Sequence, residues 1–127
     1  MSNLPKVKIR VRQAGPNTCI LEVHGELTTF AEEQLMSAYN EACDQNVHNI
    51  LLNFNGLEYM SSSGIGLLVT LLIRAQRQEK RLLACGLNEH YRHLFQLTRL
   101  NEAISIHPDE PSALAAAATP ATQAPAW

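Results

Sequence analysis

Apolar and polar residues alternate strictly near the start of the chain, where Val7, Ile9 and Val11 are separated by basic residues. This period of two is typical of a strand with one buried face. Turn residues follow at positions 15–17, and residues 18–24 form a second apolar segment, so the pattern predicts an antiparallel hairpin. Its outer face carries four basic side chains, which we expect to be solvated: Lys6, Lys8, Arg10 and Arg12.

After Gly25 the apolar spacing changes to that of an amphipathic helix. The apolar positions of this helix are Ala31, Leu35, Ala38, Tyr39 and Ala42. We expect Thr28 or Thr29 to cap it, because threonine oxygens accept hydrogen bonds from first-turn N–H groups. Residues 49–54 then form a short apolar run, which is typical of a central strand covered on both faces.

The remaining pattern alternates between helix and strand. It predicts a helix over residues 65–78, a strand over 82–85, a helix over 89–97 and a strand over 103–106. Asp109 as a cap and Pro111 in the first turn predict a last helix over residues 112–118. The element order β-β-α-β-α-β-α-β-α indicates one α/β domain.

Composition and charge narrow the class of protein. The 127 residues are 46% hydrophobic, which suffices for one core, and the formal net charge of -2 provides no global attraction to nucleic acid or to an anionic membrane. The longest apolar run, residues 65–73, is far shorter than the ~20 residues of a membrane span. No signal peptide is recognised at the N-terminus. Cys19, Cys43 and Cys85 lie among apolar residues and are expected to be buried, reduced thiols, so we predict a soluble cytoplasmic protein without membrane insertion.

The sequence favours no enzyme and no cofactor. Gly64-Ile65-Gly66 lacks the third glycine of a dinucleotide loop, and the serines before it do not form the Gly-x-Ser-x-Gly elbow of a hydrolase. The five histidines are scattered, so no metal site is predicted. We expect Gly66 to allow a close helix approach. The apolar run over residues 65–73 is expected to be mostly core, and the alternative is that its start shows apolar surface to a partner, with Leu67, Leu68 and Leu71 as candidates.

Three consecutive serines, Ser61, Ser62 and Ser63, stand where the central strand and a loop over residues 55–60 lead into a helix. Serine is a leading helix cap, so one role for this segment is structural. A phosphate at this place would meet the N–H groups and the positive dipole end of the helix, which favour an anion. Because helix starts after sheet strands face a crevice where ligands bind, the segment is a candidate binding switch.

Four segments together resemble the STAS family of bacterial anti-sigma factor antagonists: Gly25-Glu26-Leu27, Leu51-Leu52-Asn53-Phe54, residues 59–66 and residues 94–100. The resemblance covers about residues 6–116, so we assign residues 1–116 to one STAS domain and residues 117–127 to a flexible tail rich in alanine and proline. It implies a small mixed β-sheet with helices packed mainly on one face. It also implies binding to an anti-sigma factor that is a serine kinase of the histidine-kinase-like ATPase type.

The resemblance places the family's phosphoacceptor at Ser62, with Ser61 and Ser63 as alternatives. The expected partner-binding residues surround it: Glu26, Thr28, Tyr59, Met60, Ser61, Ser63, Gly64 and Leu67. Two positions depart from the family, because Ser61 and Thr28 each stand where an aspartate is usual. A second hypothesis is therefore a constitutive STAS subunit without a phosphate cycle, such as an accessory subunit of a lipid transporter or a signalling scaffold.

Overall fold

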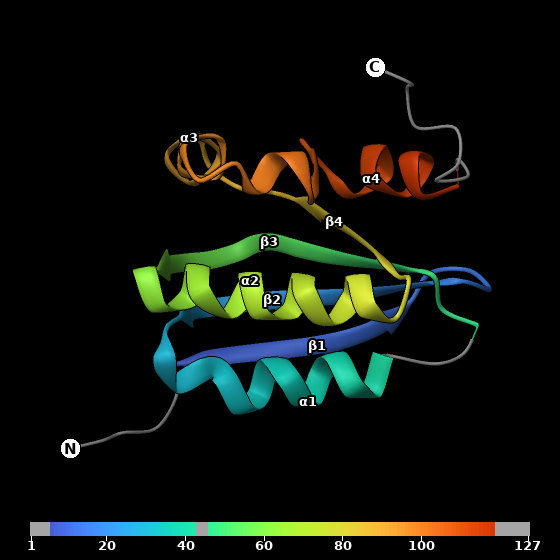
Figure 1. The fold of residues 1–127 in the computed structure, drawn as a ribbon, viewed down its shortest axis with the longest axis horizontal. Helices are drawn as coiled ribbons and strands as arrows, with labels where there is room; N and C mark the ends of the chain where they lie inside the picture. Colours follow the sequence, from blue (N-terminus) through green and yellow to red (C-terminus); the bar gives the residue numbers. More distant parts are fainter. Residues whose placement is uncertain (1–5, 43–45, 119–127) are drawn as a thin grey trace.

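The predicted order of strands and helices is present in the computed structural model, which describes residues 6–42 and 46–118 (Figure 1). The strands are β1 (Val7–Gln13), β2 (Thr18–Leu27), β3 (Asn49–Met60), β4 (Arg81–Cys85) and β5 (Ser105–His107). The helices are α1 (Glu32–Ala42), α2 (Ser62–Arg77), α3 (Glu89–Leu97) and α4 (Glu110–Ala117), with short 3-10 helices η1 (Thr29–Ala31) and η2 (Leu100–Glu102). Cys43 and the tail from residue 119 lie outside the described residues.

The five strands form one mixed sheet in the order β1-β2-β3-β4-β5. β1 pairs antiparallel with β2, and all other neighbours are parallel, so the predicted hairpin and the predicted mixed sheet are both confirmed. β3 is the central strand, as its continuous apolar run predicted. The parallel strands β2 and β3 therefore end at the same edge of the sheet.

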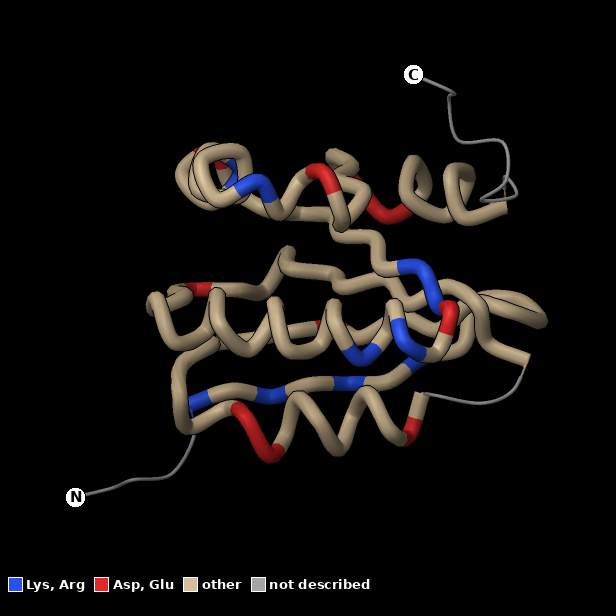
Figure 2. Tube along the Cα trace, in the orientation of Figure 1, with Lys and Arg blue, Asp and Glu red and all other residues tan. Residues whose placement is uncertain are grey.

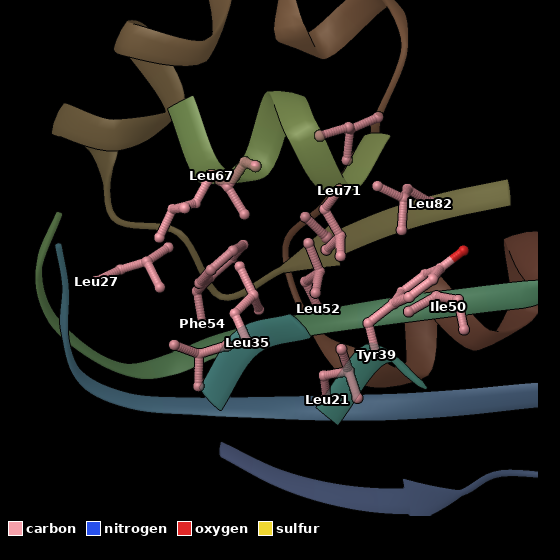
Figure 3. Close-up of a cluster of buried hydrophobic side chains, with 14 of the residues drawn as sticks. Leu21, Leu27, Leu35, Tyr39, Ile50, Leu52, Phe54, Leu67, Leu71 and Leu82 are labelled. Carbon is pink, nitrogen blue, oxygen red and sulfur yellow. The ribbon is translucent and has the colours of Figure 1, made fainter. Parts of the chain in front are cut away.

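Alternate residues of the strands enter two separate cores. On one face, Leu21, Leu52 and Phe54 pack with side chains from α1 and α2 (Figure 3). Tyr91 and Phe95 of α3 belong to the same core. On the other face, Ile20, Leu51, Leu83 and Cys85 pack against Ala113 and Ala117 of α4. Three of the four helices thus share one face of the sheet, which confirms the predicted arrangement.

Several boundaries differ from the sequence prediction. β3 continues to Met60, so the loop predicted over residues 55–60 is wrong. These residues pair with the second half of β2 through a register that shifts twice, between Glu22 and His24 and between Gly25 and Glu26. Because of these irregularities, the apolar alternation that signals a strand is lost there. The last strand begins at Ser105 rather than at residue 103, because residues 103 and 104 form a turn after η2, in which the backbone N–H groups of Ala103 and Ile104 both donate to the Leu100 carbonyl.

Charged side chains follow the outer strand and the start of α4. Lysines and arginines follow the tube along β1 in Figure 2. One of them, Arg12, donates to Glu22 of β2 and to Glu110 of α4, at 2.6 Å in both cases. The two described cysteines, Cys19 and Cys85, are buried. No helix within residues 6–42 and 46–118 is long and apolar enough to cross a membrane.

Candidate functional site

The serine segment lies where β2 and β3 end side by side. Leu27 of β2 pairs with Met60 of β3, and the backbone N–H of Ser61 donates to the Leu27 carbonyl at 3.1 Å. Two chain segments therefore leave the sheet at one edge: Thr28 leads into η1 and α1, and Ser61 leads into α2. We call this edge, formed by residues 26–30 and 58–66, the switch edge.

Gly64 sets how closely α2 approaches β2. A Cβ atom added at Gly64 would lie 2.1 Å from the Leu27 carbonyl oxygen, which is closer than any side chain tolerates. At Gly66, a Cβ atom would have no heavy atom within 4 Å. The prediction that Gly66 permits the close approach is therefore wrong, because that role belongs to Gly64.

Ser61 is the N-cap of α2, and its Oγ accepts a hydrogen bond from the backbone N–H of Gly64 at 3.1 Å. Ser62 and Ser63 follow in the first turn, and both side chains are exposed. Within the described residues, no acceptor is bonded to the Ser62 and Ser63 backbone N–H groups or to the Ser62 hydroxyl. The first turn of α2 thus presents unpaired donors beside an exposed hydroxyl, which is a favourable setting for an anion.

Thr28 has the same kind of role at the neighbouring strand end. Its Oγ1 accepts from the backbone N–H of Phe30 at 3.3 Å and caps η1. Ser61 and Thr28 are the two positions where the STAS pattern has aspartate, and aspartate, serine and threonine are all good N-caps. Both exchanges therefore keep a cap and remove a negative charge.

The other predicted partner-binding residues divide into exposed and buried groups. Tyr59 is 50% exposed and pairs in the sheet with the half-buried Glu26. Met60 is buried, and its backbone N–H donates to the hydroxyl of Tyr91 at 2.9 Å. The sequence does not predict Tyr91 at this edge, because it lies on α3, far along the chain from β3. It ties α3 to the end of β3.

Leu67, Leu68 and Leu71 belong to the core, with exposed fractions of 9%, 0% and 0%. This confirms that the run is mostly core, and the alternative that these three leucines show apolar surface to a partner is wrong. The exposed apolar residues of α2 are instead Val69 and Ile73. Val69 and Ile73 follow Ser62 by seven and eleven residues, which is close to two and three turns of an α-helix, so all three lie on the same side of α2. The helical spacing counted from Ser62 therefore identifies Val69 and Ile73 from the sequence, whereas the apolar run over residues 65–73 does not distinguish exposed from buried positions.

The switch edge carries few ionisable side chains. Its ionisable side chains within residues 26–30 and 58–66 are those of Glu26, Glu58 and Tyr59. Across the described part of the chain, no cluster of three His, Cys, Asp or Glu side chains is placed to hold a metal ion. The available chemistry at this edge is an exposed hydroxyl on a helix N-terminus, beside an exposed aromatic ring.

Comparisons with known proteins agree with this architecture. The STAS domain family model matches residues 8–113. An anti-sigma-B factor antagonist of Staphylococcus epidermidis is 26% identical over 87 residues, which covers 68% of this chain and 81% of that protein. The Bacillus cell fate determinant SpoIIAA, solved in its phosphorylated form, is 24% identical with a TM-score of 0.68, and the match covers 87% of this chain and 99% of that one.

A second solved structure with the same fold is a domain of a transporter. The STAS domain of a SulP transporter from Vibrio cholerae is 15% identical, has a TM-score of 0.64, and is matched over 84% of each chain. Both structural likenesses concern the fold, and the family model covers most of the chain. The chain belongs to the STAS domain family.

Proposed function

We propose that this chain is an anti-sigma factor antagonist whose binding to its partner is switched by phosphorylation of Ser62. The observation that carries the proposal is the exposed Ser62 hydroxyl at the first turn of α2, beside backbone N–H groups that have no bonded acceptor among the described residues. The similarity to the antagonist of Staphylococcus epidermidis supports it. The proposal implies a cytoplasmic location.

A phosphate on Ser62 would be well tolerated by the fold and poorly tolerated by a docked partner. It would carry roughly -1.5 to -2 charges next to the positive end of α2, where backbone donors favour an anion. A protein surface pressed against the switch edge would instead have to cover a strongly hydrated dianion. Phosphorylation therefore acts on binding and leaves the fold in place.

The three serines are not equivalent as acceptors. The Ser61 oxygen already accepts the Gly64 N–H as the helix cap, and modification would disturb that contact. Ser62 and Ser63 are both exposed, and Ser62 is the one that matches the family's phosphoacceptor. We therefore assign the acceptor to Ser62, with Ser63 as the position that a site-specific experiment must exclude.

The proposed partner is an anti-sigma factor that is also a serine kinase of the histidine-kinase-like ATPase type. With Thr28 and Ser61 in place of aspartates, the carboxylates left on the switch edge are those of Glu26 and Glu58. A kinase that recognises this chain must then engage Glu26, Glu58 and the Tyr59 ring. Each well-formed hydrogen bond to a charged group contributes about 1.5–3 kcal/mol, so this difference favours a partner specialised for the chain.

The test uses purified anti-sigma factors with serine kinase activity from the same organism, each mixed with the chain and ATP. We expect mass spectrometry to place one phosphate on Ser62, and calorimetry to show that Ser62→Asp weakens binding at least tenfold. Ser62→Ala should block modification and keep binding. Ser37→Asp, which adds the same charge at an exposed serine of α1, is the matched control and should bind normally. Modification confined to Ser63, or full binding by Ser62→Asp, would contradict the proposal.

A second candidate function is a constitutive STAS subunit of a transporter or signalling scaffold. It is favoured by the neutral caps Ser61 and Thr28, which lack the carboxylates of the antagonist pattern. The fold shared with the SulP STAS domain is compatible with it. This candidate predicts that none of these kinases modifies Ser62. It also predicts that a pull-down from the native cell recovers a transporter ATPase or scaffold whose binding Ser62→Asp does not weaken.

A further inference from the structure

The solvent-facing side of α2 carries one continuous stripe that begins at the candidate phosphoacceptor. Ser62, Gly66, Val69 and Ile73 are spaced by four, three and four residues, which places them on one side of the helix. We call these four residues the α2 stripe. We propose that the α2 stripe is the docking surface for the anti-sigma factor, which covers it with an apolar segment and places carboxylates near the C-terminal end of α2. This inference rests on the proposed function and specifies where its partner binds.

Gly66 is the first observation that points to a partner. Glycine in a helix interior is less favourable than alanine by roughly 0.8–1.0 kcal/mol, and it persists where close contact requires it. Gly64 has such a contact within the chain, whereas Gly66 is exposed and has open space around it. The missing side chain leaves a notch on the α2 stripe, directly after the serines, that a partner's side chain or backbone can enter.

The exposed apolar side chains are the second observation. Val69 is 38% exposed and Ile73 is 46% exposed, although most of the apolar residues of α2 are buried. Among the described residues there are five exposed large hydrophobics, and two more of them, Phe30 and Tyr59, lie on the switch edge. η1, which carries Phe30, also contacts α2. Four of the five therefore lie either on the switch edge or along the α2 stripe that begins at Ser62, as expected for a binding surface.

The charge of α2 identifies the kind of occupant. The helix contains no Asp or Glu, and its basic residues Arg74 and Arg77 stand in the last turn. Figure 2 shows basic positions near the C-terminal end of α2 and no acidic position along it. A second copy of this chain is a poor occupant, because a parallel pair of α2 helices would place arginines against arginines. An antiparallel pair would place them against a positive helix N-terminus. A different protein with apolar residues along the stripe and carboxylates at its arginine end satisfies both features.

The experiment measures binding and stability of the same variants, with the anti-sigma factor that binds the wild-type chain as the probe. Gly66→Ala fills the notch, and we expect it to raise the thermal midpoint by about 4 °C while weakening binding at least tenfold. Ile73→Ser should weaken binding about tenfold with little change in the midpoint. The matched control is Leu97→Ser, which removes an exposed apolar side chain from α3, 69% exposed, and should bind as the wild type does.

The outcomes separate this inference from the function on which it rests. If Ser62→Asp abolishes binding while Gly66→Ala and Ile73→Ser bind within twofold of the wild type, the docking surface is elsewhere and only this inference is overturned. If the wild type binds no anti-sigma factor, the proposed function and this inference are both overturned. If sedimentation shows a wild-type dimer that Ile73→Ser converts to monomer, the occupant is a second copy and the assignment to the anti-sigma factor is wrong.

Discussion

Helices α2 and α4 begin in closely similar ways and put their first turns to different uses. Each follows a strand, and each is capped by a side chain that accepts from the N–H three residues on: Ser61 from Gly64 at 3.1 Å, and Asp109 from Ser112 at 2.9 Å. In α4 the next residue, Glu110, accepts from Arg12 and from Asn53, at 2.6 and 2.8 Å. In α2 the next residue is the exposed Ser62.

The same capped helix start is thus packed against the sheet in α4 and exposed to solvent in α2. The start of α4 is held by the Glu110 carboxylate, which accepts from the Arg12 guanidinium of β1 and from the Asn53 amide of β3. Asp109 and Glu110 already supply negative charge to this helix start. The start of α2 is held by a neutral cap and by the close backbone approach at Gly64. The first turn of α2 has no acidic residue, so the positive end of its dipole would favour an anion there.

The buried thiol of Cys85, which packs against α4, has low reactivity. Burial, together with the negative charges of Glu110 and Asp109, raises the pKa of Cys85 to about 11. At neutral pH this thiol is therefore protonated and unreactive. At the start of α2, by contrast, the Ser62 side chain is exposed to solvent.

The largest effect is expected from Gly64→Ala, which tests whether backbone approach fixes the start of α2. The added Cβ would collide with the Leu27 carbonyl, so the helix must shift, and overpacking of this kind costs about 3 kcal/mol. Urea denaturation should show that loss in the free energy of unfolding. Gly66→Ala, in the same helix but in open space, is the control and should stabilise the protein. Equal effects of the two changes would show that Gly64 is not the pinning residue.

Glu110→Ala comes next and tests whether charge fixes the start of α4. It removes the acceptor of both Arg12 and Asn53 while leaving the Asp109 cap. Because the Arg12 side chain is 40% exposed, we expect a loss of only about 1–2 kcal/mol in unfolding free energy. Partner binding at the switch edge should not change. A loss of binding would mean that the two helix starts are coupled.

The predictability of these regions from sequence follows from the range of the forces involved. The Asp109 cap and the bounds of α3 were predicted correctly, because capping and helical periodicity are local. The end of β3 was predicted as a loop, because its pairing depends on an irregular register with a strand more than thirty residues away in the chain. The role of Gly64 was missed for the same reason, since only the folded backbone brings Leu27 against it.

The pH dependence of the unfolding free energy tests the ion pairs that hold the start of α4, because Arg12 donates both to Glu110 of α4 and to Glu22 of β2. Partial burial raises the pKa of Glu22, but the hydrogen bond and the charge of Arg12 outweigh it and hold the pKa below its ordinary value of 4.5. A hydrogen bond from Ser112 likewise lowers the pKa of Asp109 below 3.8. Carboxylates with lowered pKa values stabilise the fold above their unfolded values, and this contribution is lost as the pH falls through the folded values.

We therefore expect the unfolding free energy to decrease as the pH falls below about 4.5. In Glu22→Gln the decrease should be smaller, and at pH 7 this variant should be less stable by up to about 1 kcal/mol. Urea titrations at pH 7, 5, 4 and 3 measure both effects. A wild type and a Glu22→Gln variant with identical pH profiles would show that the Arg12 pair contributes nothing to stability.

The smallest effect is expected from Ser61→Asp, which gives α2 the kind of cap that α4 has. Aspartate accepts the Gly64 N–H as serine does and adds a negative charge at the positive helix end, so the unfolding free energy should change by no more than about 0.5 kcal/mol. Ser61→Ala, which removes the cap, should cost about 1 kcal/mol and so calibrates the measurement. Because Ser61→Asp preserves the fold, its effect on the rate of Ser62 phosphorylation isolates the charge that separates this chain from the usual antagonist pattern. A faster reaction would show that the kinase still reads a carboxylate at this position, whereas an unchanged rate would indicate that Glu26, Glu58 and Tyr59 suffice for its recognition.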